Sequence, residues 1–168
     1  MPYDRNCQLW PDRTEKFFAG KFLHPLKQRG PHCLSTSLAM LTGAAPECFQ
    51  GQVNTQDPVS WSEALRTKGM KLAYCPTDVR RLRFYLPELL ALDDLFTLSS
   101  FTPGRGRSIL AKPNAEGWLC GSHIVILHRG RIFDPQSGTA TPACDHECLR
   151  LHPKRIFRVV PAGHPRGL

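Results

Sequence analysis

Residues 121–138 constrain the fold more than any other part of the chain. Two apolar runs rich in β-branched and aromatic residues, 124–127 and 132–133, lie on either side of Arg129 and Gly130. Such runs around a short turn that contains glycine predict a β-hairpin. Because consecutive residues in both runs are apolar, both faces of the hairpin must be covered. We therefore expect it near the centre of a buried sheet.

The hairpin carries polar residues into this buried setting. With a two-residue loop, His128 faces Arg131, and His123, Asp134 and Gln136 emerge on one side of the sheet. His123 and Asp134 are then diagonal neighbours about 7–8 Å apart at the backbone, so the carboxylate can reach the imidazole. A three-residue loop would place them on opposite faces. A buried His and Asp are costly unless they pair or take part in chemistry, which makes them a candidate base and its partner.

A candidate nucleophile lies earlier in the chain. Apolar residues recur at helical spacing over 34–41, after the Gly-Pro pair at 30–31 and before Gly43, which stands where a helix often ends. This pattern predicts a helix whose first turn contains Cys33. The helix dipole and the free N–H groups of a first turn favour the reactive thiolate and can hold an oxyanion. Gln28 is a candidate for a further oxyanion donor, and Gln136 for orienting the imidazole.

The order of these residues resembles that of the papain-like cysteine peptidase superfamily. Gln28 precedes Cys33 at a helix start, His123 opens a core strand, and Asp134 lies on the next strand. More narrowly, Phe-Asp-Pro-Gln-Ser-Gly at 133–138 is similar to the papain-fold toxin and effector group of bacteria, several members of which deamidate protein glutamines. It is also similar to bacteriocin-processing peptidases, whose strand likewise ends in Asp-Pro near a glycine.

The resemblance implies a fold and a set of functions. The fold is α+β and papain-like: an N-terminal helical part, with the nucleophile at a helix start, packs on an antiparallel β-sheet that carries the His and the Asp. The implied activity is amide hydrolysis through a thioester on Cys33, without a cofactor, and we expect a protease with a protein or peptide substrate. A protein-glutamine deamidase of the effector type is the alternative within the same chemistry, and a transferase that uses an amine in place of water is also open. A non-catalytic papain-like module that binds an acidic partner is the alternative of another class.

Length and composition indicate one domain over residues 1–168, with an N-terminal arm at 1–27 and a flexible tail at 162–168. No apolar run is long enough to span a membrane, and no signal peptide is recognisable. We therefore expect a cytoplasmic protein, or one delivered into another cell by a specialised secretion system. The formal charge of +8 would steer acidic partners toward the surface.

Two sequence features suggest other functions less strongly. Aromatic and basic residues alternate in the arm, as in proteins that bind single-stranded nucleic acid, but we expect the arm to pack on the core and do not expect nucleic-acid binding. Cys144, His146 and Cys148 form a C-x-H-x-C pattern, yet a structural zinc site needs four ligands, so we expect no metal there. The 7 cysteines argue against a disulfide framework. The oligomeric state is left open.

The remaining elements follow from local patterns. A capping box at 60–63 predicts a short helix that ends before Gly69, and the pair at 77–78 is expected to cap a helix with Val79, Leu82 and Leu86 on one face. A further short helix is expected at 88–92, after Pro87. Strands are predicted at 70–75, 95–101 and 156–161.

Overall fold

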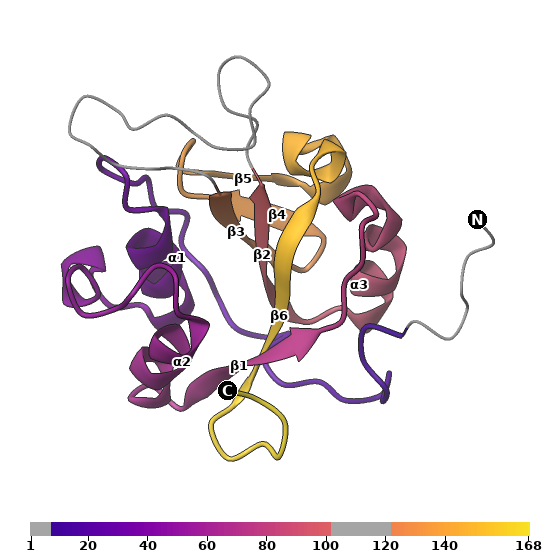
Figure 1. The fold of residues 1–168 in the computed structure, drawn as a ribbon, viewed down its shortest axis with the longest axis horizontal. Helices are drawn as coiled ribbons and strands as arrows, with labels where there is room; N and C mark the ends of the chain where they lie inside the picture. Colours follow the sequence, from indigo (N-terminus) through magenta and orange to yellow (C-terminus); the bar gives the residue numbers. More distant parts are fainter. Residues whose placement is uncertain (1–7, 102–121) are drawn as a thin grey trace.

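The structure, a computed structural model, describes residues 8–101 and 122–168. Within these residues the fold is α+β, with a 6-stranded antiparallel sheet, which confirms the predicted class (Figure 1). The strand order is β1-β6-β2-β3-β4-β5. In chain order the strands are β1 (Met70–Cys75), β2 (Leu95–Phe101), β3 (Ser122–His128), β4 (Arg131–Asp134), β5 (Thr139–Pro142) and β6 (Pro153–Pro161).

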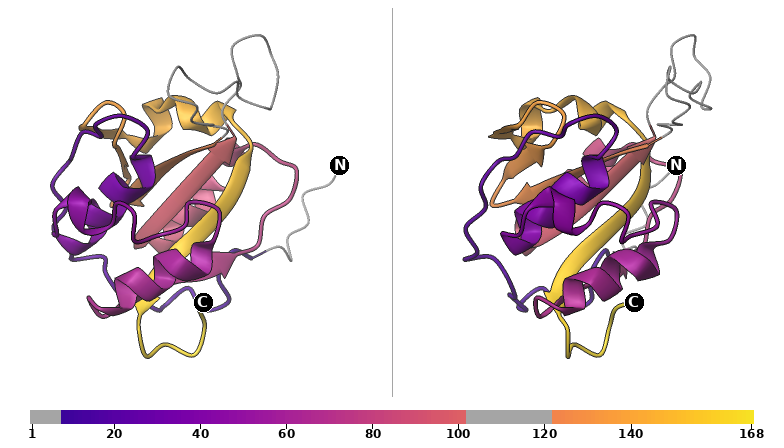
Figure 2. Two further views of the ribbon diagram at one scale, coloured as in Figure 1. Left: turned by 60° about the vertical axis from the view of Figure 1, so that its left-hand side comes forward. Right: turned by 90° about the vertical axis from the view of Figure 1, so that its left-hand side faces the viewer.

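Helices cover both faces of this sheet. Helices α1 (Cys33–Thr42) and α2 (Pro58–Arg66) lie on one face, and α3 (Leu86–Leu92) lies on the other (Figures 1 and 2). The described residues also include short 3-10 turns: η1 (Pro46–Cys48), η2 (Leu82–Phe84), η3 (Ala143–Asp145) and η4 (Glu147–Arg150). Each face has its own apolar core, because strand side chains alternate between the two. No helix in the described part of the chain has the length and apolarity to cross a membrane.

The central hairpin forms as predicted. Strands β3 and β4 pair in antiparallel fashion, with His128 opposite Arg131 and Ile126 opposite Phe133. Arg129 and Gly130 form the loop, with φ of 51° and 73°. Two consecutive left-handed residues are the geometry whose twist matches that of the flanking strands. The two-residue loop, and with it the predicted register, is confirmed.

Other elements match the predictions with local corrections. The strands predicted at 70–75 and 95–101 are confirmed, and β6 begins three residues earlier than the predicted 156. Helix α2 begins at Pro58 rather than at the capping box, because Asp57 is its N-cap and accepts a hydrogen bond from the Val59 N–H at 3.0 Å. Proline at a first helical position favours this earlier start.

The helix predicted to start at 77–78 is wrong. The chain forms only the turn η2 before α3, and Val79, expected on the buried face, is 88% exposed. Long-range contacts compete with the helix here: the Leu82 N–H donates to the Leu151 carbonyl at 2.9 Å. The Asp78 carboxylate accepts a hydrogen bond from the Tyr85 hydroxyl at 2.6 Å.

The arm and the tail both contact the sheet. The first described residues of the arm pack on the α3 face, where Trp10 is fully buried and Arg158 lies over its ring at 4.8 Å. Further along the arm, Leu23 joins the core on the α1 face. Residues 1–7 of the predicted arm lie outside the described residues. The tail at 162–168, predicted to be flexible, folds back on β1, where the Leu168 N–H donates to the Leu72 carbonyl at 2.8 Å.

Candidate active site

Cys33 is the first residue of α1, as predicted. Gly30 adopts a left-handed conformation with φ of 69°, and the helix ends at Gly43 with φ of 76°. Helix α1 packs on β3, where the Ser37 hydroxyl donates to the Ile124 carbonyl at 3.5 Å. Cys33 lies one turn before Ser37 on the same helix face. This packing brings the thiol to the start of β3.

His123 and Asp134 meet across the hairpin, as the register requires. His123 lies near the beginning of β3 and Asp134 at the end of β4. The His123 Nε2 atom is 2.7 Å from the Asp134 Oδ1 atom. The side chains are 15% and 8% exposed, so the contact is largely shielded from water. The predicted pairing of imidazole and carboxylate is confirmed, and the imidazole also interacts with the Cys33 thiol.

The surroundings of Cys33 favour its ionised form. Burial opposes ionisation, but the hydrogen bond and positive charge of His123 lower the pKa of the thiol below its ordinary value of 9.0. Backbone N–H groups of Ile124 and Leu34 act in the same direction. Cys75 shows the opposite behaviour, because burial raises the pKa of its thiol to about 12. Among the described cysteines, Cys33 therefore has the features of a reactive thiolate.

The partners of His123 favour its charged form. Burial would lower the pKa of the imidazole, but hydrogen bonds and charge from Asp134 and Cys33 raise it to about 9. Burial likewise opposes ionisation of Asp134, yet its hydrogen bonds to His123 and His146 hold the pKa of the carboxyl well below its usual range. Together these shifts favour the thiolate form of Cys33, the imidazolium form of His123 and the carboxylate form of Asp134.

His146 is a site residue that the sequence analysis missed. Its Nε2 atom is 2.8 Å from Asp134 Oδ2, and its Nδ1 atom accepts a hydrogen bond from the Cys148 N–H at 3.1 Å. A ring that accepts at Nδ1 carries its proton on Nε2, so His146 donates to the carboxylate. Two histidines therefore hold the two oxygens of Asp134. The C-x-H-x-C pattern indicated His146 as a possible zinc ligand and not as a partner of Asp134.

The structure gives the two glutamines different places from those expected. The Gln136 side chain is exposed, and the residue contacts the site through its backbone N–H, which donates to Asp134 Oδ1 at 2.9 Å. The Gln28 side chain donates from Nε2 to the Gly30 carbonyl at 2.9 Å. Gln28 is not among the described residues that line the cavity beside Cys33. The first-turn N–H groups of α1 remain as the oxyanion donors that the geometry offers.

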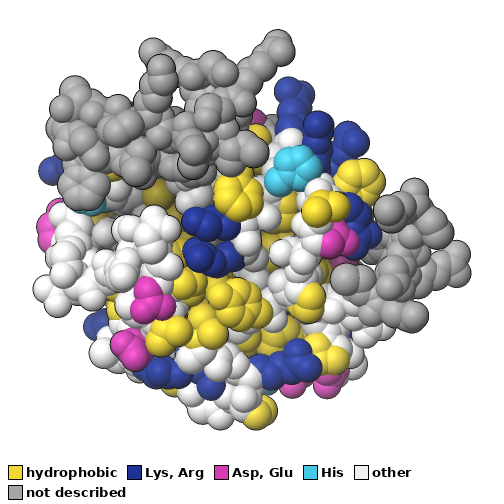
Figure 3. Space-filling model, viewed as in Figure 1, with side chains coloured by type: hydrophobic (Ala, Val, Ile, Leu, Met, Phe, Trp, Pro, Cys, Tyr) yellow, Lys and Arg dark blue, Asp and Glu magenta, His cyan; other side chains and the backbone are white. Residues whose placement is uncertain are grey.

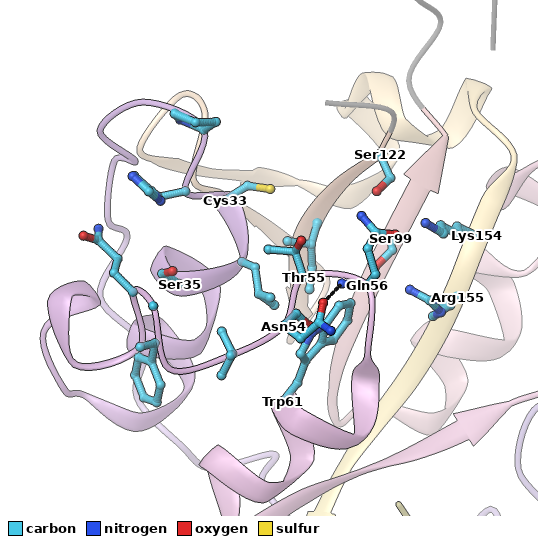
Figure 4. A pocket seen from close by; sticks show the side chains of 18 of the residues that line it. Cys33, Ser35, Asn54, Thr55, Gln56, Trp61, Ser99, Ser122, Lys154 and Arg155 are labelled. Atoms are coloured by element: carbon cyan, nitrogen blue, oxygen red, sulfur yellow. Dashed lines mark hydrogen bonds between the residues drawn. The ribbon is translucent and has the colours of Figure 1, made fainter. Parts of the chain in front are cut away.

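Cys33 opens onto a cavity of about 600 Å³, which we call the Cys33 cavity. Figure 4 shows the sulfur pointing into this space from the α1 side. The opposite wall is formed by Ser99 of β2 and by Lys154 and Arg155 of β6. Asn54, Thr55 and Gln56 from the segment before α2 also line the cavity. The cavity is large enough for a peptide segment.

No metal cluster is found within residues 8–101 and 122–168, where no group of three or more His, Cys, Asp and Glu is placed to hold an ion. Cys144 is exposed, and Cys148 is buried on the α3 face. Both ring nitrogens of His146 are already used, by Asp134 and by the Cys148 N–H.

Comparison of the chain with protein-family models, with curated proteins and with solved structures found no match.

Proposed function

We propose that this protein is a papain-like cysteine hydrolase that cleaves amide bonds in proteins or peptides. One observation carries the proposal: a thiol at a helix start interacts with an imidazole whose Nε2 atom is 2.7 Å from a carboxylate oxygen. The sulfur faces a cavity. A nucleophile, its base and a group that orients the base are the parts that acyl transfer requires.

The first half of the reaction forms a thioester. The Cys33 thiolate attacks the carbonyl carbon, and the resulting oxyanion is stabilised by backbone N–H groups of the first turn of α1. His123, protonated at rest, gives its Nδ1 proton to the leaving amine as the C–N bond breaks. Asp134 keeps the ring oriented and stabilises its charge, the role of the carboxylate in such triads.

The second half releases the acyl group. Neutral His123 takes a proton from water, the resulting hydroxide attacks the thioester carbonyl, and the Cys33 thiolate leaves. The released acid and the thiolate–imidazolium pair complete the cycle. The same steps at a glutamine side chain would release ammonia instead of a peptide amine, so the product identifies which amide is attacked.

The first test measures the reactivity of Cys33 with iodoacetamide across pH, followed by peptide mapping. Exposed Cys48 and Cys144 are internal controls, because their thiols are accessible and lie outside the triad. We expect Cys33 to be alkylated much faster than both near neutral pH. In His123→Ala the advantage should disappear, since burial then opposes ionisation of Cys33 without a neighbouring positive charge.

Activity is tested with a mixture of proteome-derived peptides, by mass spectrometry for cleavage and by an ammonia assay for deamidation. Cys33→Ala should abolish either product, and Cys144→Ala is the matched control that should not. If Cys33 reacts no faster than Cys48 in the native protein, the hydrolase proposal is wrong. Partner binding that weakens steeply with salt would then favour the non-catalytic module.

A further inference from the structure

The Cys33 cavity has a strongly one-sided charge. Lys154 and Arg155 line it, and its described lining contains no Asp or Glu. On the face shown in Figure 3, basic side chains lie near the centre beside hydrophobic ones. Neither Lys154 nor Arg155 forms an ion pair with a carboxylate of the described residues. The cavity therefore presents two positive charges that the described part of the protein does not neutralise.

A β-bulge explains why two consecutive residues line the same cavity. Side chains normally alternate between the faces of a strand, so neighbours point in opposite directions. The register between β2 and β6 shifts here: Ser99 pairs with Arg155 and Ser100 pairs with Pro153, which leaves Lys154 as the extra residue. Bulges redirect side chains and are frequent beside active sites. This one turns Lys154 toward the side that Arg155 already faces.

The cations are held in place by aromatic rings rather than by acids. The Lys154 Nζ atom lies 5.9 Å from the centre of the Phe101 ring, and the Arg155 guanidinium lies 5.6 Å from that of Trp61. Such contacts orient a cation but leave its charge available to a ligand. Burial, followed by the charge of Arg155, lowers the pKa of Lys154. The charge of a bound anion would stabilise the ammonium form of Lys154 and oppose this lowering of the pKa.

A buried hydroxyl between the nucleophile and the cations points to the same occupant. Ser99 is 3% exposed, lines the cavity, and its Oγ atom has no hydrogen-bond partner among the described residues. Ser99 pairs with Ile124 on one side and with Arg155 on the other. An unpaired buried hydroxyl is costly, and a polar ligand in the cavity would satisfy it.

The sheet fixes how far the cations lie from the reacting bond. The Ile124 N–H interacts with the Cys33 sulfur, and Arg155 lies two strands away from Ile124 in the same row. Neighbouring strands are about 4.8 Å apart, so the separation is roughly 10 Å. An extended peptide advances about 3.3 Å per residue, and roughly three residues span that distance.

We propose that the Cys33 cavity selects peptide segments that carry an acidic side chain within about three residues of the attacked amide. The acidic group binds Lys154 and Arg155, while Ser99 donates a hydrogen bond to the segment between them and Cys33. This substrate class rests on the proposed hydrolase function. It applies whether the attacked amide is in the backbone or in a glutamine side chain.

The charge of the cavity is testable without knowing the substrate. Iodoacetate and iodoacetamide alkylate a thiolate by the same displacement of iodide and differ in charge. The rate with iodoacetate divided by the rate with iodoacetamide at Cys33 therefore reports the local electrostatic potential. The same ratios at exposed Cys48 and Cys144 are the references. In Lys154→Gln/Arg155→Gln we expect this ratio to fall about three- to tenfold, and the fall should shrink at high salt.

The control variant is Arg81→Gln/Arg83→Gln, which removes two exposed cations outside the described lining of the cavity. Its ratio should equal that of the native protein. His123 is unchanged in both variants, so its charge cannot cause a difference. An unchanged iodoacetamide rate shows that the site is intact. If the double variant loses that rate, Lys154→Gln alone carries the comparison, with about half the effect on a logarithmic scale.

The outcomes separate the two proposals. A reactive Cys33 with the same ratio in both double variants overturns the acidic substrate class and leaves the hydrolase proposal standing. An unreactive Cys33 overturns the hydrolase and the inference with it. Peptides that differ only by Asp, Asn or phosphoserine near the scissile bond then identify the anion. A preference for Asp over Asn that is lost in Lys154→Gln/Arg155→Gln supports the proposal, and a preference for phosphoserine alone overturns the carboxylate assignment.

Discussion

Replacing His146 with Asn separates the two hydrogen bonds that this residue makes. As N-cap of η4, the His146 side chain accepts a hydrogen bond from the Cys148 N–H, and Asn is a favourable residue at such a position. The shorter Asn side chain does not extend to Asp134 Oδ2, which the imidazole contacts at 2.8 Å. The variant should therefore keep the cap and lose the contact with the carboxylate.

The size of the effect follows from the remaining contacts of Asp134. A hydrogen bond to a charged group contributes about 1.5–3 kcal/mol. Asp134 keeps its other oxygen paired with His123 at 2.7 Å and with the Gln136 N–H at 2.9 Å. His146 also fixes the carboxylate in the orientation that faces His123. If half of the lost energy reflects poorer orientation toward His123, the imidazolium is destabilised by about 0.8–1.5 kcal/mol. The pH at which the Cys33 thiolate forms should then rise by roughly half to one unit.

The rate of iodoacetamide labelling of Cys33 against pH measures this shift. The acid limb of the profile should move to higher pH in His146→Asn and further in Asp134→Asn, because each change weakens the support of the His123 charge. An unfolding curve measured in parallel reports the structural cost. A His146→Asn protein that unfolds more easily but keeps its acid limb would show that His146 supports only the fold.

Three further predictions concern stability, each measured by urea unfolding. Burial opposes the ionisation of Asp134, but hydrogen bonds to the carboxylate lower its pKa below the ordinary 3.8. The ionised carboxyl therefore stabilises the fold above pH 3.8, and this contribution is lost as the pH falls further. Asp134→Asn should flatten the acid side of the curve of unfolding free energy against pH. The Asp94 carboxylate is fully buried and lies 2.6 Å from the Arg158 guanidinium, so Asp94→Asn should lower the free energy of unfolding by about 3 kcal/mol or more. Asp78→Asn, at an exposed ion pair, is the control and should leave the free energy of unfolding nearly unchanged. Gly138 has φ of 72°, and an added Cβ would lie 2.7 Å from the Lys27 Cβ, so Gly138→Ala should destabilise more than Gly43→Ala, where φ is 76° but the space is open.

Local signals were sufficient to predict the parts of the site that lie within single elements. The hairpin followed from two apolar runs and a glycine in the turn, and strand alternation then placed His123 and Asp134 on one face. Cys33 at a helix start followed from the Gly-Pro pair before it and Gly43 after it. In each case the determining interactions are between residues close in sequence.

Contacts between distant segments determine the rest and leave no local pattern. The Leu82 N–H donates to the Leu151 carbonyl, and this contact competes with the helix that the apolar spacing indicates. His146 reaches Asp134 only because η3 and η4 turn the chain back over the end of the hairpin. The bulge at Lys154 is a mismatch between β6 and β2, which pair across a long stretch of chain. Neither strand alone predicts it.

Two buried clusters of ionisable groups lie within residues 8–101 and 122–168, and their surroundings distinguish them. The Asp94–Arg158 pair is fully buried and closed: the carboxylate also accepts the Phe17 and Phe18 N–H groups, and the guanidinium lies between aromatic rings. The Cys33 cluster ends instead at a sulfur on the wall of a cavity. Apolar residues in place of either cluster could give similar or higher folding stability. A buried ionic cluster that opens to a cavity therefore indicates a chemical role more than a stabilising one. Losing Asp94 should therefore lower stability while the folded fraction keeps a reactive Cys33. Losing His123 should remove the reactivity of Cys33 with a much smaller loss of stability.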